Sequence, residues 1–331
     1  MAPITFREIS IAVSYKCNLS CSHCCSKSYV KSCEKIDISS IKKIFYDASY
    51  IGIKKINITG GEPLLFEKNI SDMISLAKKL KIAITITSNG FWGSSSEKAI
   101  EKIKELKDNG LNELYLSTDR FHLEFIPLNQ IIEISETCKE LYLPVIVFVS
   151  EILDDDCSNL IKQKLKEKKI PYVCQCTLPF GSNKMYLKKN FKLYTTKVSS
   201  IYPCESPLNP FIDPFRDVYM CCSPIEYNKE SFFYLGKIKN SLSEILYKNP
   251  QNKIAHFLVT EGPAKLLYQV ENLLKKKGFR RKSKYFGKCD LCFQILGNKT
   301  YTEEITNFIE NYQPNTKIDK ISAFPIENLK V

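Results

Sequence analysis

Three cysteines on one short stretch constrain this chain more than any other feature. Cys17, Cys21 and Cys24 are separated by three and then by two residues. Three thiolates on one loop can hold three irons of a [4Fe–4S] cube and leave the fourth iron open, whereas such clusters are normally held by four cysteines. Buried or zinc-binding cysteines are the alternative. Zinc sites prefer paired Cys-x2-4-Cys knuckles with four ligands, and no second knuckle lies nearby. We therefore favour a cluster whose open iron binds a small chelating ligand.

The Cys-x3-Cys-x2-Cys spacing resembles the signature of the radical SAM superfamily. This resemblance, which extends from about Phe6 to Cys292, implies that S-adenosylmethionine (SAM) binds the open iron through its amino and carboxylate groups. In that family the residue before the third cysteine is usually aromatic and lies beside the adenine. Here that residue is His23.

A glycine-rich tetrapeptide, Gly60-Gly61-Glu62-Pro63, follows a predicted strand. Two glycines let the backbone approach a ligand without an intervening Cβ, and the carboxylate of Glu62 can meet an ammonium group. The tetrapeptide resembles the GGEP motif of radical SAM enzymes, which contacts the amino group of SAM. An ordinary tight turn is the alternative for this motif.

Polar residues also follow the next two predicted strands. By resemblance to the family, Ser88 and Asn89 contact the carboxylate or ribose of SAM, and Ser117 and Asp119 contact SAM or substrate. Arg120 is a candidate partner for a substrate carboxylate. The alternatives are a simple loop for the first pair and a helix cap for Asp119.

Strands and helices alternate along the first half of the chain. Strands are predicted over 6–14, 55–59, 82–87, 113–117, 144–149 and 172–177, with helices over 37–52, 70–80, 97–109, 128–141 and 159–169. This pattern predicts parallel βαβ units, and six strands fit a partial (β/α)6 TIM barrel. Ligand groups should then gather at the C-terminal ends of the strands, where all of the motifs lie.

The alternation stops after residue 181. We expect a radical SAM partial barrel over 1–183, a linker over 184–200 and a smaller α+β domain over 201–331. In the second domain the sequence predicts strands over 210–212 and 217–220, and helices over 242–247, 253–259, 265–275 and 302–311.

The composition places the chain among ordinary globular proteins, with 44% hydrophobic and 25% charged residues. The start of the chain has no apolar signal segment and no apolar run is long enough to span a bilayer, so we expect a cytoplasmic location and no membrane partner. Fourteen cysteines in such a chain indicate metal or redox chemistry. The net charge of +12 is read as solvated helix surface. An acidic partner, either a peptide leader or RNA, is the alternative.

Five further cysteines lie in the second domain: Cys204, Cys221, Cys222, Cys289 and Cys292. Cys289 and Cys292 form a Cys-x2-Cys unit, which is common in metal sites. On ligand count alone, zinc is possible. The layout resembles the SPASM or twitch domain of radical SAM enzymes, which implies that Cys204, Cys221, Cys289 and Cys292 hold an auxiliary [4Fe–4S] cluster.

One cysteine then exceeds the four ligand positions. Adjacent residues on a strand point to opposite faces, so Cys222 points away from a cluster held by Cys221. It is either a buried inert thiol or a hydrogen-atom donor. Together with Cys25, next to the third cluster cysteine, this pair resembles the radical SAM epimerases that make epipeptides. Asp213, in the turn before Cys221, is a candidate contact to the peptide backbone or a solvated turn residue.

The resemblance implies an epimerase that converts L- to D-residues in a ribosomal precursor peptide. It also implies an electron donor such as flavodoxin or ferredoxin. A SPASM-type enzyme that forms a thioether or carbon–carbon cross-link is the main alternative. We favour a peptide over RNA as substrate, and an iron–sulfur electron carrier would have no use for the motif at Gly60-Gly61-Glu62-Pro63.

Overall fold

A single sheet runs through both halves of the chain. The computed structural model describes residues 6–26, 28, 30–180, 184–221, 229–249 and 252–312. Their strands lie in the order β6-β5-β4-β3-β2-β1-β7-β8-β9. The first six are β1 (Glu8–Ala12), β2 (Lys55–Thr59), β3 (Ala83–Ser88), β4 (Glu113–Thr118), β5 (Val145–Glu151) and β6 (Tyr172–Cys176).

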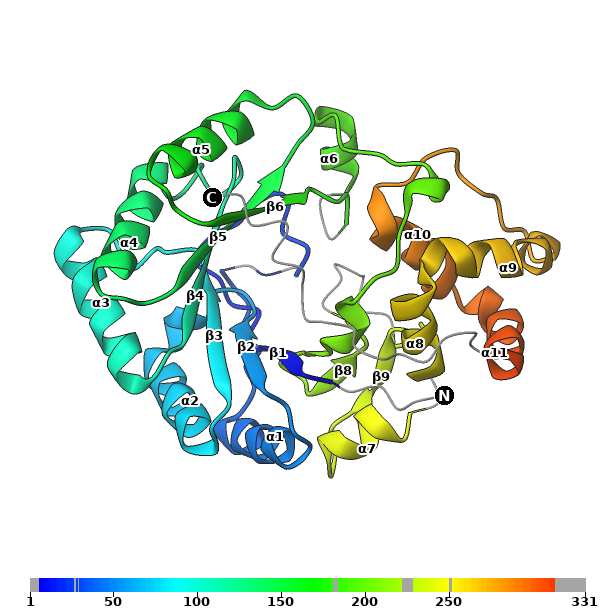
Figure 1. Ribbon diagram of the computed structural model, residues 1–331, viewed down its shortest axis with the longest axis horizontal. Coiled ribbons are helices and arrows are strands. Elements are labelled where there is room, and N and C mark those ends of the chain that lie inside the picture. The colour runs from blue at the N-terminus through cyan, green and yellow to red at the C-terminus, as the bar shows by residue number, and fades with distance from the viewer. Residues whose placement is uncertain are drawn as a thin grey trace.

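These six strands are all parallel, and the helices between them cover the outer side of the curved sheet (Figure 1). The helices are α1 (Ile38–Tyr50), α2 (Glu67–Leu80), α3 (Ser96–Asn109), α4 (Leu128–Glu140) and α5 (Asp156–Glu167). The predicted partial (β/α)6 barrel is therefore confirmed. Each helix returns the chain to the edge where the next parallel strand begins.

Local sequence signals set where several of these helices begin. Asp37, Ser95 and Asp155 precede α1, α3 and α5, and each side chain accepts a hydrogen bond from a backbone N–H in the first turn. Such caps satisfy donors that have no partner within the helix. The helices then bury the apolar stripes that the sequence predicts.

Alternation along the strands separates an aliphatic layer from a polar interior. In β2, Ile56 and Ile58 are 0% exposed and pack in the core. Successive strand residues point to opposite faces, so Asn57 lies on the other face, where its Oδ1 accepts hydrogen bonds from Thr85 Oγ1 at 3.0 Å and Thr87 Oγ1 at 3.2 Å. The concave side of the sheet is thus polar.

The second half of the chain extends the barrel sheet instead of forming a detached sheet. β7 (Phe211–Ile212) pairs in parallel with β1, and β8 (Asp217–Tyr219) and β9 (Tyr234–Lys237) continue antiparallel from it. The two predicted strands on either side of the turn at 213–216 are confirmed. Because β7 runs parallel to β1, the turn after it lies at the same edge as the three-cysteine loop.

The helices described after β9 include α7 (Leu242–Tyr247), at the lower edge of Figure 1 near α1, and α8 (Asn252–Thr260), α9 (Gly262–Lys276), α10 (Gly287–Leu296) and α11 (Thr302–Asn311), which lie on the right. Four of these match predicted helices. α10, which carries Cys289 and Cys292, was not predicted, because its Cys-x2-Cys unit was interpreted as a metal-binding knuckle.

The predicted linker over 184–200 also contains a helix, α6 (Lys184–Asn190). α6 buries one residue, Leu187, so its sequence carries no apolar periodicity from which a helix could be inferred. Figure 1 shows α6 between β6 and α10. α6 therefore lies where the chain passes from the barrel to the second half.

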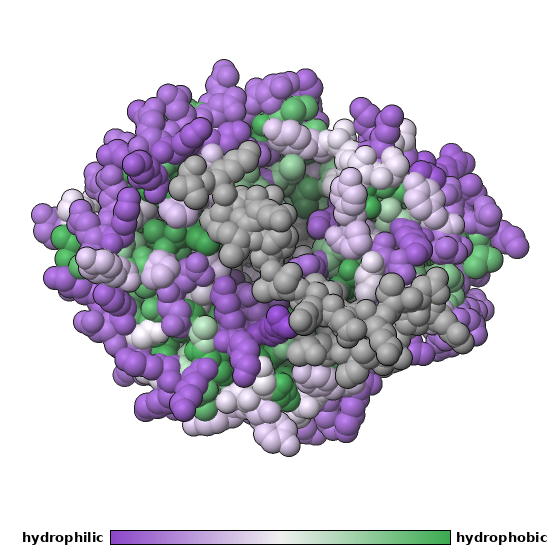
Figure 2. All heavy atoms as spheres, in the orientation of Figure 1, coloured by the Kyte–Doolittle hydropathy of each residue, from purple (hydrophilic) through white to green (hydrophobic). Residues whose placement is uncertain are grey.

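Among the residues described, no helix is long and apolar enough to cross a membrane. Figure 2 shows hydrophilic residues over most of the outer rim of the molecule, where the helices lie. Hydrophilic side chains therefore cover much of the outer helix faces, and the assignment of the net positive charge to these faces stays a prediction.

A hydrogen bond between α7 and α1 joins the second half of the chain to a barrel helix, and its removal should lower stability. The backbone N–H of Leu242, at the start of α7, donates to Asp47 Oδ2 of α1 at 2.9 Å. Asp47→Ala removes this acceptor and should lower the free energy of unfolding by about 1 kcal/mol, measured by urea denaturation. Asp47→Asn keeps an acceptor oxygen and should lose less. Asp72→Ala, at an exposed position of α2, should change stability little, and an equal loss there would contradict this assignment.

Candidate active site

The three cysteines of the first loop come together directly after β1. Cys17 and Cys21 are half-buried and pack against the core, and the backbone N–H of Cys24 donates to the carbonyl of Cys21 at 3.1 Å. Burial, with the negative charge of Glu62 and of Cys24, raises the pKa of Cys17 to about 11. Burial also raises the pKa of Cys21, with contributions from Asp119 and the other two thiols. The three thiols thus lie on one loop and influence one another's ionisation, which suits three ligands of one cluster.

The two glycines after β2 hold this loop against the sheet. The N–H of Gly61 donates to the carbonyl of Ser14, and the N–H of Glu62 donates to the carbonyl of Lys16, both at 2.8 Å. A Cβ at Gly60 would overlap with the Ser14 oxygen, and a Cβ at Gly61 with the Lys16 oxygen. The close approach that the glycines permit is therefore to the backbone of the cysteine loop. Their predicted contact with a ligand stays a prediction.

Glu62 is a buried carboxylate that accepts three hydrogen bonds. It is 1% exposed, and its oxygens accept from the N–H of Leu64 at 3.0 Å, Ser88 Oγ at 3.0 Å and the N–H of Asn89 at 2.7 Å. Burial raises its pKa to about 7 despite these bonds. Among the described residues, no lysine or arginine forms an ion pair with Glu62. A buried carboxylate in this state fits a ligand that brings its own ammonium group.

Ser88 and Asn89 connect Glu62 to the cysteine loop. Asn89 Nδ2 donates to Asn18 Oδ1 at 3.0 Å and lies 3.8 Å from Cys17 Sγ. Ser88 Oγ also accepts from Trp92 Nε1 at 3.0 Å. The end of β3 is thus fixed beside the three thiols. The contacts of Ser88 and Asn89 with SAM stay predictions.

A buried aspartate holds two histidines next to the third cluster cysteine. Asp119 Oδ2 lies 3.0 Å from His23 Nε2 and 2.9 Å from His122 Nδ1, while Oδ1 accepts from the N–H groups of Phe121 and His122. Burial opposes ionisation of this carboxyl group, but the two imidazoles hold its pKa well below the ordinary value. The ring of His23 stacks on Phe121 with centroids 4.5 Å apart.

The structure therefore brings together two predicted residues, His23 and Asp119, and adds His122 and Phe121 to them. The sequence offered a signal for this addition, because Asp119 to His122 follows directly on β4. With its Nε2 near Asp119, His23 has a buried Nδ1 that lacks a hydrogen-bond partner within the described part of the chain. A bound molecule next to the loop could supply one.

Arg120 has a protein carboxylate as its partner. Its Nη1 pairs with Asp155 Oδ1, and its guanidinium lies 5.0 Å from the centroid of the Phe191 ring. Asp155 also caps α5 through the N–H of Ser158 at 2.9 Å. Ser117 is half-buried near the end of β4. The predicted roles of Arg120 with substrate and of Ser117 with SAM or substrate stay predictions.

Four cysteines of the second half form another group. Cys204, Cys221 and Cys292 are buried and Cys289 is half-buried. Burial raises the pKa of Cys292 well above its ordinary value, with further contributions from Cys204, Cys289 and Cys221. The group is assembled from three separate segments, and four thiols suit an iron–sulfur cluster or zinc. The fifth cysteine, Cys222, lies outside the described residues.

Asp213 lies at the end of β7, at the same edge of the sheet as the cysteine loop. It is 3% exposed, and its Oδ1 accepts from the N–H groups of Phe215 and Asp217, both at 2.9 Å. Burial raises its pKa to about 6. Asp213 is therefore a buried turn residue. The alternative of a solvated turn residue is wrong. Contact with a peptide stays a prediction.

Comparison with known proteins finds relatives over most of the chain. Residues 11–162 match the family described as the Radical SAM superfamily. The chain is 23% identical over 316 residues to YydG of Bacillus subtilis (strain 168), whose name places it in peptide biosynthesis; the match covers 92% of this chain and 97% of YydG. It is 30% identical over 226 residues to GTP 3′,8-cyclase of Clostridium acetobutylicum, covering 63% of this chain and 69% of the cyclase.

The fold is similar to that of native anSMEcpe with bound AdoMet and Cp18Cys peptide. The TM-score is 0.54 at 15% identity, and the match covers 92% of this chain and 99% of that one. The likeness therefore extends through both halves of the chain.

The packing of Gly61 against the cysteine loop can be tested directly. Gly61→Ala should displace the loop at Lys16 and lower the free energy of unfolding by about 1–3 kcal/mol, as overpacking does, and lower the iron bound after anaerobic reconstitution. Gly52→Ala is a matched control, because a Cβ there meets nothing within 4 Å although φ is +83°. It should cost only about 1 kcal/mol of backbone strain and leave iron content unchanged. Equal iron content in both variants would refute the packing role.

Proposed function

Because the chain belongs to the radical SAM superfamily, we propose that it is a peptide-modifying enzyme that converts L-residues to D-residues in a ribosomally synthesised peptide. Members of this superfamily use a [4Fe–4S] cluster and SAM. The loop with Cys17, Cys21 and Cys24 fits the cluster through its grouped thiols. Glu62 fits the amino group of SAM because it is a buried acceptor that forms no ion pair with a lysine or arginine among the described residues.

The proposal of a peptide substrate rests on the share of the chain that each relative matches. The match to YydG includes 92% of this chain, whereas the match to the GTP 3′,8-cyclase includes 63%. A relative that matches nearly the whole chain carries more weight for the substrate, because the barrel alone is shared by enzymes with many activities.

One observation supports epimerisation in particular: four cysteines of the second half lie close enough to influence one another and would suffice as a second ligand set. Cys204, Cys221, Cys289 and Cys292 are grouped, and four thiolates satisfy a [4Fe–4S] cluster. Cys222 is therefore not needed as a ligand, and it follows a ligand directly in the sequence. A cross-linking enzyme has no need of such an additional thiol.

The residues of the chain then have separate tasks. Cluster and SAM, when bound, supply the abstraction of the Cα hydrogen atom from a substrate residue. The Cys222 thiol donates its hydrogen atom to the opposite face of that carbon, so the S–H bond breaks and a new C–H bond forms with inverted configuration. Cys222 is left one hydrogen atom short, and an electron donor of the flavodoxin or ferredoxin class, with a proton from solvent, restores the thiol.

Replacing Cys222 separates hydrogen abstraction from hydrogen return. With the small peptide encoded beside the gene, SAM and a reductant in D2O, the unaltered protein should form 5′-deoxyadenosine and add one deuterium for each D-residue. Cys222→Ala should still form 5′-deoxyadenosine but no D-residue. Cys33→Ala, at an exposed thiol, should behave as the unaltered protein. Mass spectrometry and chiral amino-acid analysis check these outcomes.

Two results would reject this proposal. Undiminished D-residue formation by Cys222→Ala would remove that thiol from the mechanism. Loss of two hydrogens from the peptide, with no deuterium gained, would indicate a cross-link and favour the SPASM-type alternative.

The burial of Glu62 predicts a pH dependence of SAM binding. Its raised pKa of about 7 means that the group is neutral below pH 7 and charged above it, and the carboxylate is the stronger acceptor for the N–H groups of the SAM amino group. SAM affinity should therefore rise about tenfold from pH 6 to pH 8, measured by anaerobic calorimetric titration. Glu62→Gln should bind SAM more weakly with no such rise. Glu67→Gln, at an exposed carboxyl group of α2, should keep the rise. A flat profile in the unaltered protein would contradict the assignment.

A further inference from the structure

Helix α6 shares an apolar cluster with the cysteine loop. Leu187 of α6 is 0% exposed and packs in this cluster with Phe121, Ile152 and Leu193, and Cys21 packs against the cluster. The buried side of α6 is therefore linked through this cluster to one of the three cluster cysteines. Figure 1 places the helix beside β6, at the passage to the second half of the chain.

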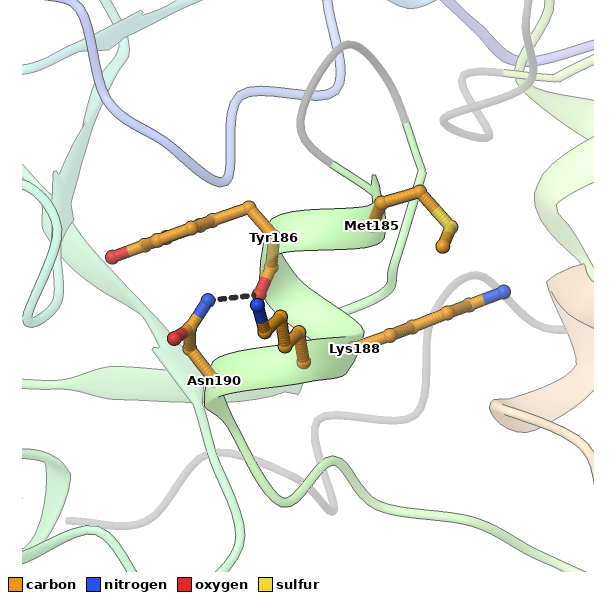
Figure 3. Close-up of a pocket in the computed structure, with 5 residues that line it drawn as sticks. Met185, Tyr186, Lys188 and Asn190 are labelled. Atoms are coloured by element: carbon orange, nitrogen blue, oxygen red, sulfur yellow. Dashed lines mark hydrogen bonds between the residues drawn. The ribbon is translucent and has the colours of Figure 1, made fainter.

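The same helix exposes apolar and basic side chains in more than one direction, and Lys188 Nζ lies 5.5 Å from the centroid of the Phe286 ring. Met185 is 71% and Tyr186 is 48% exposed, and Lys188 and Lys189 are also exposed. These residues, with Asn190, line a surface pocket of about 510 Å³. Figure 3 shows Tyr186 and Lys188 extending from the helix in opposite directions, and Asn190 bonded to the Tyr186 carbonyl at 2.9 Å. This set of five residues is called the α6 surface below.

Ring contacts connect the α6 surface to the cysteine loop. Tyr186 lies 5.9 Å from Phe191, Phe191 lies 5.4 Å from Phe121, and Phe121 lies 4.5 Å from His23, all between ring centroids. His23 directly precedes Cys24. A molecule that occupies the α6 surface therefore lies a few side chains away from the candidate active site.

We propose that the α6 surface is a docking site for an acidic segment of the peptide substrate, held by Lys188 and Lys189, with an apolar side chain against Met185 and Tyr186. This inference rests on the proposed function, because it assumes that the substrate is a peptide. It adds the chemical class of the segment that is recognised and the place where it binds.

Charge complementarity supports this occupant. The sequence of α6 contains three lysines and no acidic residue, and the nearby carboxylate of Asp154 is paired with Lys192. Exposed lysines attract an anionic partner and speed its association, while exposed Met and aromatic side chains form the apolar part of peptide-binding surfaces. RNA could use the lysines and stack on Tyr186, but 71% exposure of an apolar methionine favours a partner with apolar side chains.

The experiment measures binding apart from chemistry. The precursor peptide encoded beside the gene is labelled with fluorescein and titrated with the reconstituted protein, and binding is followed by anisotropy. Lys188→Glu/Lys189→Glu should weaken binding about tenfold at low salt, with the difference shrinking at about 0.5 M salt as screening increases. Lys42→Glu/Lys43→Glu, at two exposed lysines of α1, makes the same change of net charge and should leave affinity unchanged.

A second pair of probes identifies the kind of partner. A peptide whose acidic residues are changed to glutamine should bind the unaltered protein as weakly as the full-charge peptide binds the Lys188→Glu/Lys189→Glu variant. Equal affinity of that variant and the unaltered protein for the precursor would overturn the proposal. If the Lys188→Glu/Lys189→Glu variant lost binding to a 20-nucleotide RNA but bound the peptide with unchanged affinity, the proposal would also be overturned. The α6 surface would then be assigned to nucleic acid.

The outcomes separate this inference from the proposed function. D-residue formation together with peptide binding that does not depend on Lys188 and Lys189 would reject the α6 surface and keep the epimerase. Peptide binding that depends on these lysines without any D-residue formation would keep the docking site and reject epimerisation.

Discussion

The site depends on one backbone contact, in which the end of β2 closes onto the loop after β1. The N–H groups of Gly61 and Glu62 donate to the carbonyls of Ser14 and Lys16, and the glycines leave no Cβ between the two segments. The three thiols are thereby held at a fixed place relative to the carboxylate of Glu62. SAM would have to contact both the cluster held by these thiols and the carboxylate of Glu62. The distance between the two must therefore be fixed by the fold.

Two buried carboxylates near this contact have opposite electrostatic environments. Glu62 accepts hydrogen bonds but forms no ion pair with a lysine or arginine within the described part of the chain, and burial raises its pKa to about 7. Asp119 faces the two imidazoles of His23 and His122, which hold its pKa low. Groups whose surroundings move their pKa values apart serve different roles. Asp119 keeps two rings in place, whereas Glu62 is suited to a cation that arrives with the ligand.

The second half of the chain is tied to the barrel through the same sheet. β7 adds in parallel to β1, so the turn with Asp213 and the segment leading to Cys221 lie at the edge that carries the cysteine loop. Further contacts fix this arrangement, including the bond from the Leu242 N–H to Asp47. The position of the four grouped cysteines of this half is thus fixed relative to the mouth of the barrel.

The sequence by itself determined the alternating strands and helices, the three-cysteine loop and the motif at Glu62, because these depend on side-chain periodicity, caps and spacings within a few residues. Only the tertiary structure decided which distant residues meet. It joined His122 to His23, paired Arg120 with Asp155, added β7 to the barrel sheet and placed α6 beside Cys21. Such contacts link segments from tens to about two hundred residues apart in the sequence. A local sequence pattern does not specify which of several chemically suitable residues will contact a given buried group.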